Sequence, residues 1–290
     1  NYGIRPLIYG ENEKNYMIVS ESIALESCDY NIISDVNNYV SFRNIGFKEK
    51  DSFDINIRNT GMNIYDIRPC IFEYIYLARP ESIINNISVY QSRINMGKSL
   101  AKKIIYDFQS ANFKAVNYNG KLAEIDMLIP VPDTSLIATS AMSVELNIPI
   151  NFAIIKNRYI DRTFIMKDQK ERKSNIQKKL YIIREEVKGK CVMIIDDSIV
   201  RGNTCKYIVK SLRDAGAFKV YIASCAPEIR YRNFYGIDLP AFEELIAYNK
   251  NILQISQELN ADWIFFQNLP DLIKCVGNNY ITNFELSIFN

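Results

Sequence analysis

The stretch CVMIIDDSIVRGNTCKYIVKSLRDAGA, residues 191–217, constrains the fold more than any other part of the chain. It begins with the apolar run CVMII, which is typical of a buried strand. In its second half, Ile208, Val209 and Leu212 share one helical face, and Gly216 is a typical helix stop. A strand that leads through a short turn into an amphipathic helix is the repeating unit of α/β folds.

Strands and helices alternate along most of the chain. We expect further strands over 125–131, 149–155, 219–226 and 262–266, and helices over 88–108, 136–147 and within 242–259. This order predicts an α/β fold with a mainly parallel sheet and helices on both faces. The first part of the chain differs, because β-type segments such as YMIVSESIAL and YVSFR are punctuated there by turn signals. We therefore expect a β-rich segment over 1–68 and an α/β domain over 69–290.

The composition excludes several classes of protein. A net charge of +2 over 290 residues is too small for a dedicated nucleic-acid binder, and no apolar run is long enough to span a bilayer. We therefore expect no nucleic-acid partner and no membrane partner. The six cysteines are scattered without a C-x-x-C pair, which predicts free thiols, several of them buried, in a reducing compartment such as the cytoplasm.

The chain contains no histidine. This absence excludes Ser-His-Asp and Cys-His catalysis, H-E-x-x-H zinc sites and imidazole proton shuttles. Any chemistry must then depend on positioning, carboxylates, hydroxyls, backbone amides, cations or a metal.

The end of the strand in residues 191–217 predicts a ligand site. Ligands of open α/β sheets bind beyond the carboxyl ends of the strands, where Asp196, Asp197 and the turn 198–204 are expected. Free N–H groups at the start of the next helix favour a phosphate, and Gly202 permits close approach of the backbone. The carboxylates would repel a phosphate, so they suit sugar hydroxyls or Mg²⁺. The simpler alternative is an exposed strand end followed by a helix capped by Thr204.

Several blocks resemble a known family. VMIIDDSIVRGNT resembles the phosphoribosyl pyrophosphate signature of type I phosphoribosyltransferases. NYGIRPL, SESIAL, FEYIYLARPES, IPVPDTS, IKNRYIDRTFI and APEIRYRNFYGID resemble, in order, blocks of the amidophosphoribosyltransferase family. The resemblance implies a type I phosphoribosyltransferase fold over 69–290. It also implies that 1–68 is the C-terminal remnant of an N-terminal-nucleophile glutaminase domain, of the type 2 glutamine amidotransferase class.

The resemblance implies a reaction and a set of site residues. The family forms 5-phosphoribosylamine and pyrophosphate from phosphoribosyl pyrophosphate and ammonia, which glutamine supplies, at the committed step of purine synthesis. The substrate-binding residues it implies are Asp133, Thr134, Ser135, Asp196, Asp197, Ser198, Ile199, Val200, Arg201, Gly202, Asn203 and Thr204. Thr134, Asp196 and Asp197 are the implied Mg²⁺ residues. The implied catalytic residues, on a basic loop that closes over substrate, are Lys156, Arg158, Tyr159 and Arg162.

The chain departs from the family pattern at two places. It begins with Asn1 where the family's glutaminase nucleophile is an N-terminal cysteine, so we expect this chain to use ammonia directly. Cys70 matches one ligand of the iron–sulfur cluster that some members hold, but Asn233 stands at another ligand position, so we expect no cluster. The resemblance further implies a homo-oligomer, a tetramer in the family, and purine nucleotides as feedback inhibitors.

Two alternatives remain open from the sequence. The chain could bind phosphoribosyl pyrophosphate as a non-catalytic regulator, as some transcription regulators with this fold do. It could also be an inactive relic, which the shortened glutaminase portion favours. The two intact turns, 133–135 and 198–204, favour an enzyme over both.

Overall fold

The computed structural model describes residues 3–13, 15–36, 39–44, 53–58, 67–110, 125–157, 180–235 and 241–289, with the backbone alone for 39–44 and 53–58. The chain forms two compact units. The first comprises Asn1–Ser92, Asn233–Leu239 and Ile273–Ser287, and the second comprises Arg93–Arg232, Pro240–Leu272 and Ile288–Asn290.

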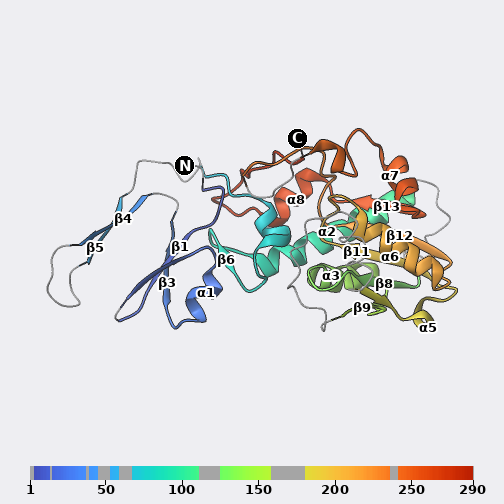
Figure 1. Cartoon of the computed structure of the whole chain (residues 1–290), viewed down its shortest axis with the longest axis horizontal. Coiled ribbons are helices and arrows are strands. Elements are labelled where there is room, and N and C mark those ends of the chain that lie inside the picture. The colour runs from blue at the N-terminus through green and yellow to red at the C-terminus, as the bar shows by residue number, and fades with distance from the viewer. Residues whose placement is uncertain are drawn as a thin grey trace. The chain divides into compact units, whose positions relative to one another are not determined.

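The second unit is built on a parallel sheet (Figure 1). Its strands, in spatial order, are β13 (Trp263–Phe266), β12 (Lys219–Ser224), β11 (Cys191–Asp196) and β8 (Met127–Pro130). All three pairings are parallel, and Ile195 of β11 stands between Ala223 and Pro130. The structure thus confirms the predicted parallel sheet and four of its strands.

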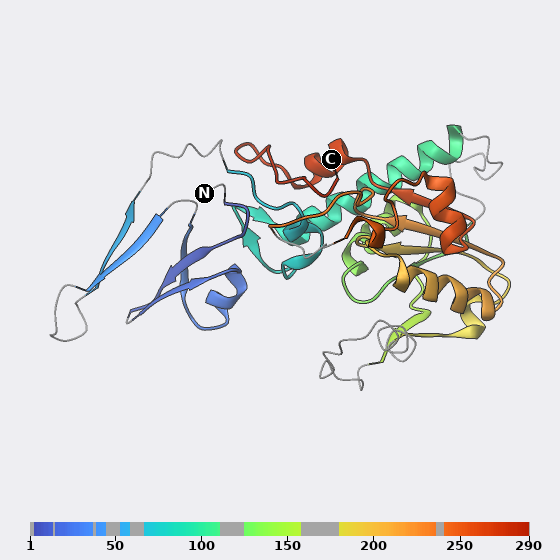
Figure 2. The same ribbon diagram turned by 45° about the horizontal axis from the view of Figure 1, so that its top comes forward.

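Helices cover both faces of this sheet, as predicted. Helices α6 (Asn203–Asp214) and α7 (Ile252–Leu259) pack with Ile194 and Val220 in one core cluster. On the opposite face, helix α2 (Val89–Ser110) places Phe108 against Phe265, with ring centres 5.3 Å apart. Figure 2 shows α2 and α6 on opposite sides of the strands. Because both faces are buried, these strands are apolar along nearly their whole length.

Helix α3 (Leu136–Leu146) lies against α2. The contact is so close at Gly97 that an added Cβ would lie 2.2 Å from the carbonyl oxygen of Ala138. Glycine is therefore required at this helix crossing for lack of space, and not for its backbone freedom. The predicted helices over 88–108 and 136–147 are both confirmed.

Two predicted elements are wrong in detail. The strand expected over 149–155 is shortened to β9 (Ile154–Lys156), which pairs with β10 (Leu180–Ile182) in a separate antiparallel sheet. Its beginning makes only an isolated bridge to β8, because Pro149 has no N–H to extend the ladder.

The helix expected within 242–259 is interrupted. A 3₁₀ turn, η3 (Phe242–Glu244), is separated from α7, which begins at Ile252 because Asn251 caps it. The Asn251 side chain accepts a hydrogen bond from the Gln254 N–H, and the Gln254 side chain accepts one from the Asn251 N–H, both at 2.9 Å. Helices α5 (Arg184–Val187) and α8 (Leu269–Val276) were not predicted.

The first unit is rich in short strands, as expected. Strands β1 (Ile8–Glu11), β2 (Tyr16–Val19) and β3 (Asn31–Asp35) form an antiparallel sheet in the order β2-β1-β3. Strands β4 (Tyr39–Asn44) and β5 (Phe53–Arg58) pair with each other, as do β6 (Ile83–Ile84) and β7 (Ile87–Ser88). The prediction of β-structure throughout YMIVSESIAL is wrong after Val19, because Ser22–Glu26 forms helix α1 and buries Leu25.

The first unit also contains a π-helix. The segment Glu73–Leu77 is a π-helix, η2, with Glu73 buried beside Arg5 in an ion pair of 2.8 Å. All six cysteines of the chain are free thiols, and four of them are buried, which confirms the predicted free and partly buried thiols. Among the helices of the described segments, none combines the length and apolar character that crossing a membrane would require.

The crossing of α2 and α3 gives a test of the packing. Replacing Gly97→Ala should lower the free energy of unfolding by about 2 kcal/mol, because the methyl group overlaps the Ala138 carbonyl and forces the helices apart. In an open helical position the same change would raise stability by roughly 1 kcal/mol. Urea unfolding measures the difference, with Lys98→Ala on an exposed position of the same helix as the control. A neutral or stabilising Gly97→Ala would contradict the packing described here.

Candidate functional site

The two predicted ligand turns lie at the same edge of the sheet. Strands β8 and β11 are neighbours and parallel, so their carboxyl ends meet there, and Ile195 is paired with Pro130 just before both turns begin. The Thr134 hydroxyl donates a short hydrogen bond to Oδ2 of Asp197, which joins one turn directly to the other. Residues 63 positions apart in the sequence therefore form one site.

The two aspartates at the end of β11 are almost fully buried. Asp196 is 8% exposed and Asp197 is 7% exposed. Oδ1 of Asp196 accepts a hydrogen bond from the Asp197 N–H at 3.0 Å, and its Oδ2 lies 3.5 Å from the Cys205 thiol. Asp197 accepts a second hydrogen bond from the Ser198 hydroxyl at 2.8 Å. Both carboxylates are thus oriented by donors that belong to the site itself.

Burial raises the pKa of both aspartates. For Asp196, burial and the neighbouring charge of Asp197 raise the pKa well above its ordinary value. For Asp197, burial raises the pKa, while the hydrogen bonds from Thr134 and Ser198 oppose the rise. Two adjacent carboxylates that are both short of solvation would gain from a nearby cation. This donor set fits Mg²⁺, which proteins hold through one or two carboxylates together with substrate phosphates and water.

The site differs from a closed metal centre. Within the part of the chain that the structure describes, no three His, Cys, Asp or Glu side chains converge as metal ligands. The aspartate pair and the Thr134 hydroxyl could hold only part of the coordination sphere of an ion, and a ligand or water would supply the rest.

The turn 198–204 is shaped for an anion. Gly202 is the N-cap of α6 and has a left-handed backbone conformation, with φ of 72°. The left-handed conformation favours glycine, and a Cβ at this position would also displace Cδ1 of Ile246, from which it would lie 2.3 Å. The turn leads directly into the N-terminus of a helix, where free N–H groups and the helix dipole favour a phosphate.

The simpler interpretation of this turn is wrong on two points. The strand end is buried and not exposed, as the exposed fractions of Asp196 and Asp197 show. Thr204 is not the N-cap, because the helix already begins at Asn203. The other predicted residues of the turn are divided between core and surface: Ile199 is buried, whereas Arg201 pairs through Nε with Glu244 at 2.5 Å.

The turn 133–135 has one buried and two accessible predicted residues. Ser135 is 1% exposed, and its hydroxyl donates to the Val131 carbonyl at 2.7 Å, so this side chain holds the turn in place. Asp133 is exposed and pairs with Nζ of Lys156 at 2.8 Å. The peptide bond between Pro132 and Asp133 is cis.

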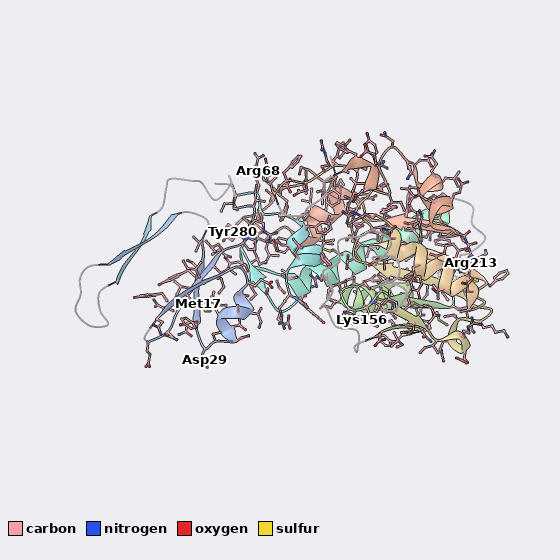
Figure 3. All side chains as sticks on the ribbon, in the orientation of Figure 1. Met17, Asp29, Arg68, Lys156, Arg213 and Tyr280 are labelled. Atoms are coloured by element: carbon pink, nitrogen blue, oxygen red, sulfur yellow. The ribbon has the colours of Figure 1, made fainter. Side chains whose placement is uncertain are left out.

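One of the four predicted catalytic residues is brought to the site. Lys156 ends strand β9, and its contact with Asp133 places its ammonium group beside the turn 133–135 (Figure 3). Arg158, Tyr159 and Arg162 lie outside the described residues.

Two residues of the site were not predicted from the sequence. Cys205 occupies the third position of α6, where burial raises its pKa well above the ordinary value, so its protonated thiol can donate to Asp196. Arg93 on α2 is 3% exposed, and its charge opposes the rise that burial causes in the pKa of Asp197. The sequence did offer a signal for Arg93, because this charged residue lies beside the apolar stripe of a predicted helix.

Asn233, in the first unit, is held by hydrogen bonds from its side chain. Its Nδ2 donates to Oε2 of Glu285 at 3.1 Å and to the hydroxyl of Ser287 at 3.2 Å. Cys70, for which the resemblance implied a match to a cluster ligand, is buried, and burial raises its pKa to about 11. Its thiol is therefore protonated near neutral pH.

Comparison with known proteins identifies relatives along the whole chain. The family described as the phosphoribosyl transferase domain matches residues 101–233. The amidophosphoribosyltransferase of Pseudomonas aeruginosa is 41% identical over 99% of this chain, and that of Escherichia coli is 40% identical over 99%. The chain spans 55% of the length of each of these relatives.

A solved structure shows the same fold. Glutamine phosphoribosylpyrophosphate amidotransferase from Bacillus subtilis, complexed with ADP and GMP, matches 99% of this chain with a TM-score of 0.78 and 32% identity. This chain covers 59% of that structure. The expected type I phosphoribosyltransferase fold and the resemblance to amidophosphoribosyltransferases are thus confirmed.

The acidic pair predicts an unusual effect of mutation on stability. Replacing Asp196→Asn should raise the free energy of unfolding at pH 7 by about 1 kcal/mol, because it removes one of two adjacent buried charges. The pKa values of the folded protein are raised, so the folded state holds these protons more tightly than the unfolded state. Protonation of these two aspartates therefore stabilises the folded state. This stabilisation is complete at pH values below the pKa of the unfolded state, and it is lost as the pH rises through the pKa values of the folded state.

Urea unfolding between pH 4 and pH 8 measures this effect. The loss of stability with rising pH should be smaller in Asp196→Asn than in the wild type. Asp214→Asn, an exposed aspartate near the end of α6, is the control and should leave the slope unchanged. Equal slopes in the wild type and in Asp196→Asn would contradict the pKa shift of Asp196.

Proposed function

We propose that this chain, which is homologous over 99% of its length to amidophosphoribosyltransferases, forms 5-phosphoribosylamine and pyrophosphate from phosphoribosyl pyrophosphate and ammonia. The observation that carries the proposal is the pair of ligand turns at one sheet edge, joined by the hydrogen bond from Thr134 to Asp197. A phosphate turn beside an acidic pair suits a sugar that carries a phosphate on one side and hydroxyls on the other.

Each part of the site has a role in this reaction. The backbone of 198–204 and the N-terminus of α6 hold the 5′-phosphate. Asp196 and Asp197 accept hydrogen bonds from the ribose hydroxyls and would hold Mg²⁺ together with Thr134. When bound, Mg²⁺ would supply positive charge to the pyrophosphate. The turn 133–135 and Lys156 bind the pyrophosphate as negative charge develops on it.

The reaction does not require the histidine that the chain lacks. Ammonia is already a nucleophile, and the barrier lies in breaking the bond between ribose C1 and pyrophosphate. Positioning of the ammonia in line with that bond, and stabilisation of the leaving group, can supply most of the rate enhancement. Arg158, Tyr159 and Arg162 remain proposed members of the loop that closes over the leaving group.

The other parts of the proposal rest on the relatives. We assign residues 1–68 to the end of the glutaminase domain of these enzymes, and residues 69–290 to the phosphoribosyltransferase domain. The Bacillus subtilis relative is complexed with ADP and GMP, which supports purine nucleotides as inhibitors of this chain. Glutamine as the nitrogen source of the whole protein, a homo-oligomer and a place in the cytoplasm belong to the same proposal.

Substrate binding should require the metal and the acidic pair. Phosphoribosyl pyrophosphate should bind in the presence of Mg²⁺ and not in EDTA. Replacing both Asp196 and Asp197 by Asn should weaken binding by more than about tenfold, or roughly 1.4 kcal/mol. Titration calorimetry measures both effects, with Asp214→Asn as the control. Equal affinity with and without EDTA would overturn the metal assignment, and unchanged affinity of the double variant would make the carboxylates structural.

The nitrogen donor distinguishes the enzyme from the two alternatives. The 290-residue chain should release pyrophosphate from phosphoribosyl pyrophosphate with an ammonium salt and not with glutamine. The rate should rise with pH as the fraction of free ammonia increases, since no histidine is available to deprotonate ammonium. Turnover with glutamine would overturn the prediction for this chain. Tight binding without turnover would favour the regulator, and a folded chain that neither binds nor reacts would favour the relic.

A further inference from the structure

The phosphate turn rests on a neighbouring segment that has little regular structure of its own. We call residues 241–250 the bracing segment; beyond the 3₁₀ turn η3 they contain neither helix nor strand. The N–H of Ile246 donates to the Val200 carbonyl at 2.9 Å, and Glu244 pairs with Arg201. The Ile246 side chain fills the space against Gly202. The shape of the turn therefore depends on where the bracing segment lies.

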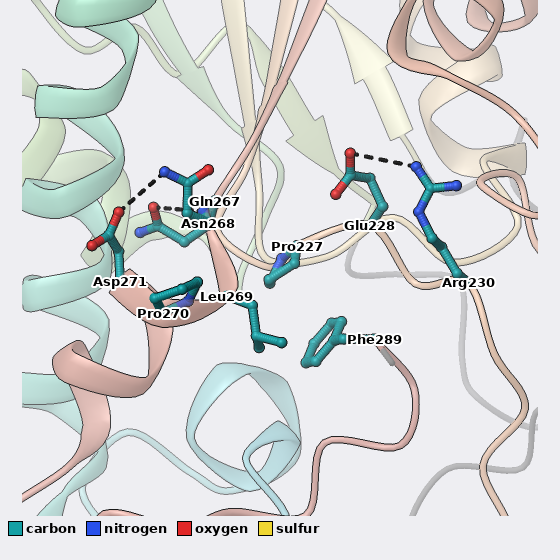
Figure 4. Close-up of a pocket in the computed structure, with 9 residues that line it drawn as sticks. All are labelled: Pro227, Glu228, Arg230, Gln267, Asn268, Leu269, Pro270, Asp271 and Phe289. Atoms are coloured by element: carbon teal, nitrogen blue, oxygen red, sulfur yellow. Dashed lines mark hydrogen bonds and ion pairs between the residues drawn. The ribbon is translucent and has the colours of Figure 1, made fainter.

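One arginine, Arg230, holds the bracing segment through two of its main-chain carbonyls. Nη1 of Arg230 donates hydrogen bonds to the carbonyls of Ala247 at 2.8 Å and Lys250 at 3.0 Å. The main-chain N–H of Arg230 donates to the Ile288 carbonyl at 3.0 Å, so the residue is itself anchored. Figure 4 shows Arg230 at one end of a pocket, where Glu228 approaches its guanidinium at 3.7 Å.

A charged hydrogen-bond donor strongly restricts the backbone of a segment that lacks regular secondary structure. Helices and strands align their own carbonyls with N–H groups, whereas an irregular segment must find other donors. The hydrogen bonds from a guanidinium are charge-assisted, and two of them to neighbouring carbonyls fix the backbone in one place. A second contact acts on the start of the segment, where Arg232 lies 4.5 Å from the centre of the Phe242 ring.

The other ligand turn is held in a different way. Ser135 donates to the Val131 carbonyl, and its own carbonyl accepts from both the N–H and the hydroxyl of Thr139 in α3. These bonds lie within one turn and its helix. The hydrogen bond that joins the two turns runs from Thr134 to Asp197 at the strand end, whereas the bracing segment contacts Val200 and Gly202. We therefore expect a change at Arg230 to reach the far part of the phosphate turn through the bracing segment and to leave the turn 133–135 in place.

We propose that Arg230 is a positioning residue for the 5′-phosphate, acting through the bracing segment on the turn 198–204. This inference rests on the proposed function, because it assigns the 5′-phosphate to that turn. It makes a selective prediction: loss of the guanidinium weakens recognition of the phosphate and leaves recognition of pyrophosphate unchanged.

The test compares two ligands on the same variants. Titration calorimetry with ribose 5-phosphate and with magnesium pyrophosphate is run on the wild type, Arg230→Met and Arg230→Lys. Arg230→Met should weaken ribose 5-phosphate binding by at least about fivefold and change pyrophosphate binding by less than about twofold. Arg230→Lys keeps one charged donor and should restore part of the phosphate affinity.

Arg213 provides a matched control. It is another partly buried arginine, and its guanidinium donates a hydrogen bond to the main-chain carbonyl of Phe218 at 3.1 Å. It also forms an ion pair with Asp262 at 2.6 Å. It lies at the opposite edge of the sheet, where β12 and β13 begin, because Phe218 directly precedes β12 and Asp262 directly precedes β13. Arg213→Met should lower stability without changing the affinity for either ligand. Equal weakening of both ligands by Arg230→Met, or no weakening, would overturn the inference.

A ligand-free measurement separates this inference from the proposed function. Hydrogen exchange of the Ile246 amide and of the turn 198–204 should be at least about tenfold faster in Arg230→Met than in the wild type, while 136–146 exchanges as before. If the wild type binds neither ligand, the proposed function is wrong, and the exchange rates still decide whether Arg230 holds the turn. Unchanged exchange at Ile246 would overturn the role of Arg230.

Discussion

The structure of the whole site depends on two carboxylates that are buried side by side at the end of β11. Water cannot solvate Asp196 and Asp197 fully, so the protein must supply donors in its place. The Asp197 N–H, the thiol of Cys205 and the hydroxyls of Thr134 and Ser198 do so. One of these donors comes from the next strand, and the unfavourable acidic pair thereby ties the two ligand turns together. The proposed function gives this unfavourable arrangement a use, because a cation and hydroxyl groups would bind there.

The parallel sheet is what makes this arrangement possible. Because β8 and β11 run in the same direction, both of their turns open at one edge, and each leads into a helix N-terminus. The two helices lie on different faces of the sheet, since α6 packs in one core cluster and α3 crosses α2 on the other side. Two positive helix ends therefore converge on one region, with the carboxylates between them.

The sequence predicted those parts of the fold and site that depend on local pattern. The strand–turn–helix units, the acidic pair and the requirement for Gly202 are all encoded within short segments. What failed depends on distant partners or on a single capping residue: β9 pairs with β10 outside the main sheet, and Asn251 delays the start of α7. Cys205 could have been found, because the third position of a helix after an acidic strand end points back to it. Arg93 left a signal, because it is a charged residue beside the apolar stripe of its predicted helix. Arg230 left none, since its contacts arise only in the folded chain.

The two arginines at opposite edges of the sheet explain why we expect stability and ligand recognition to be separable in this unit. Arg213 and Arg230 both donate to main-chain carbonyls of segments that lack regular structure. Arg213 closes the edge where the strands begin, and its hydrogen bonds serve only the fold. Arg230 holds residues whose other side contacts the turn 198–204, so the same kind of bond there also sets the distance between N–H groups that would surround a phosphate. Whether an arginine of this kind is structural or positioning therefore depends on what the segment that it holds contacts in turn.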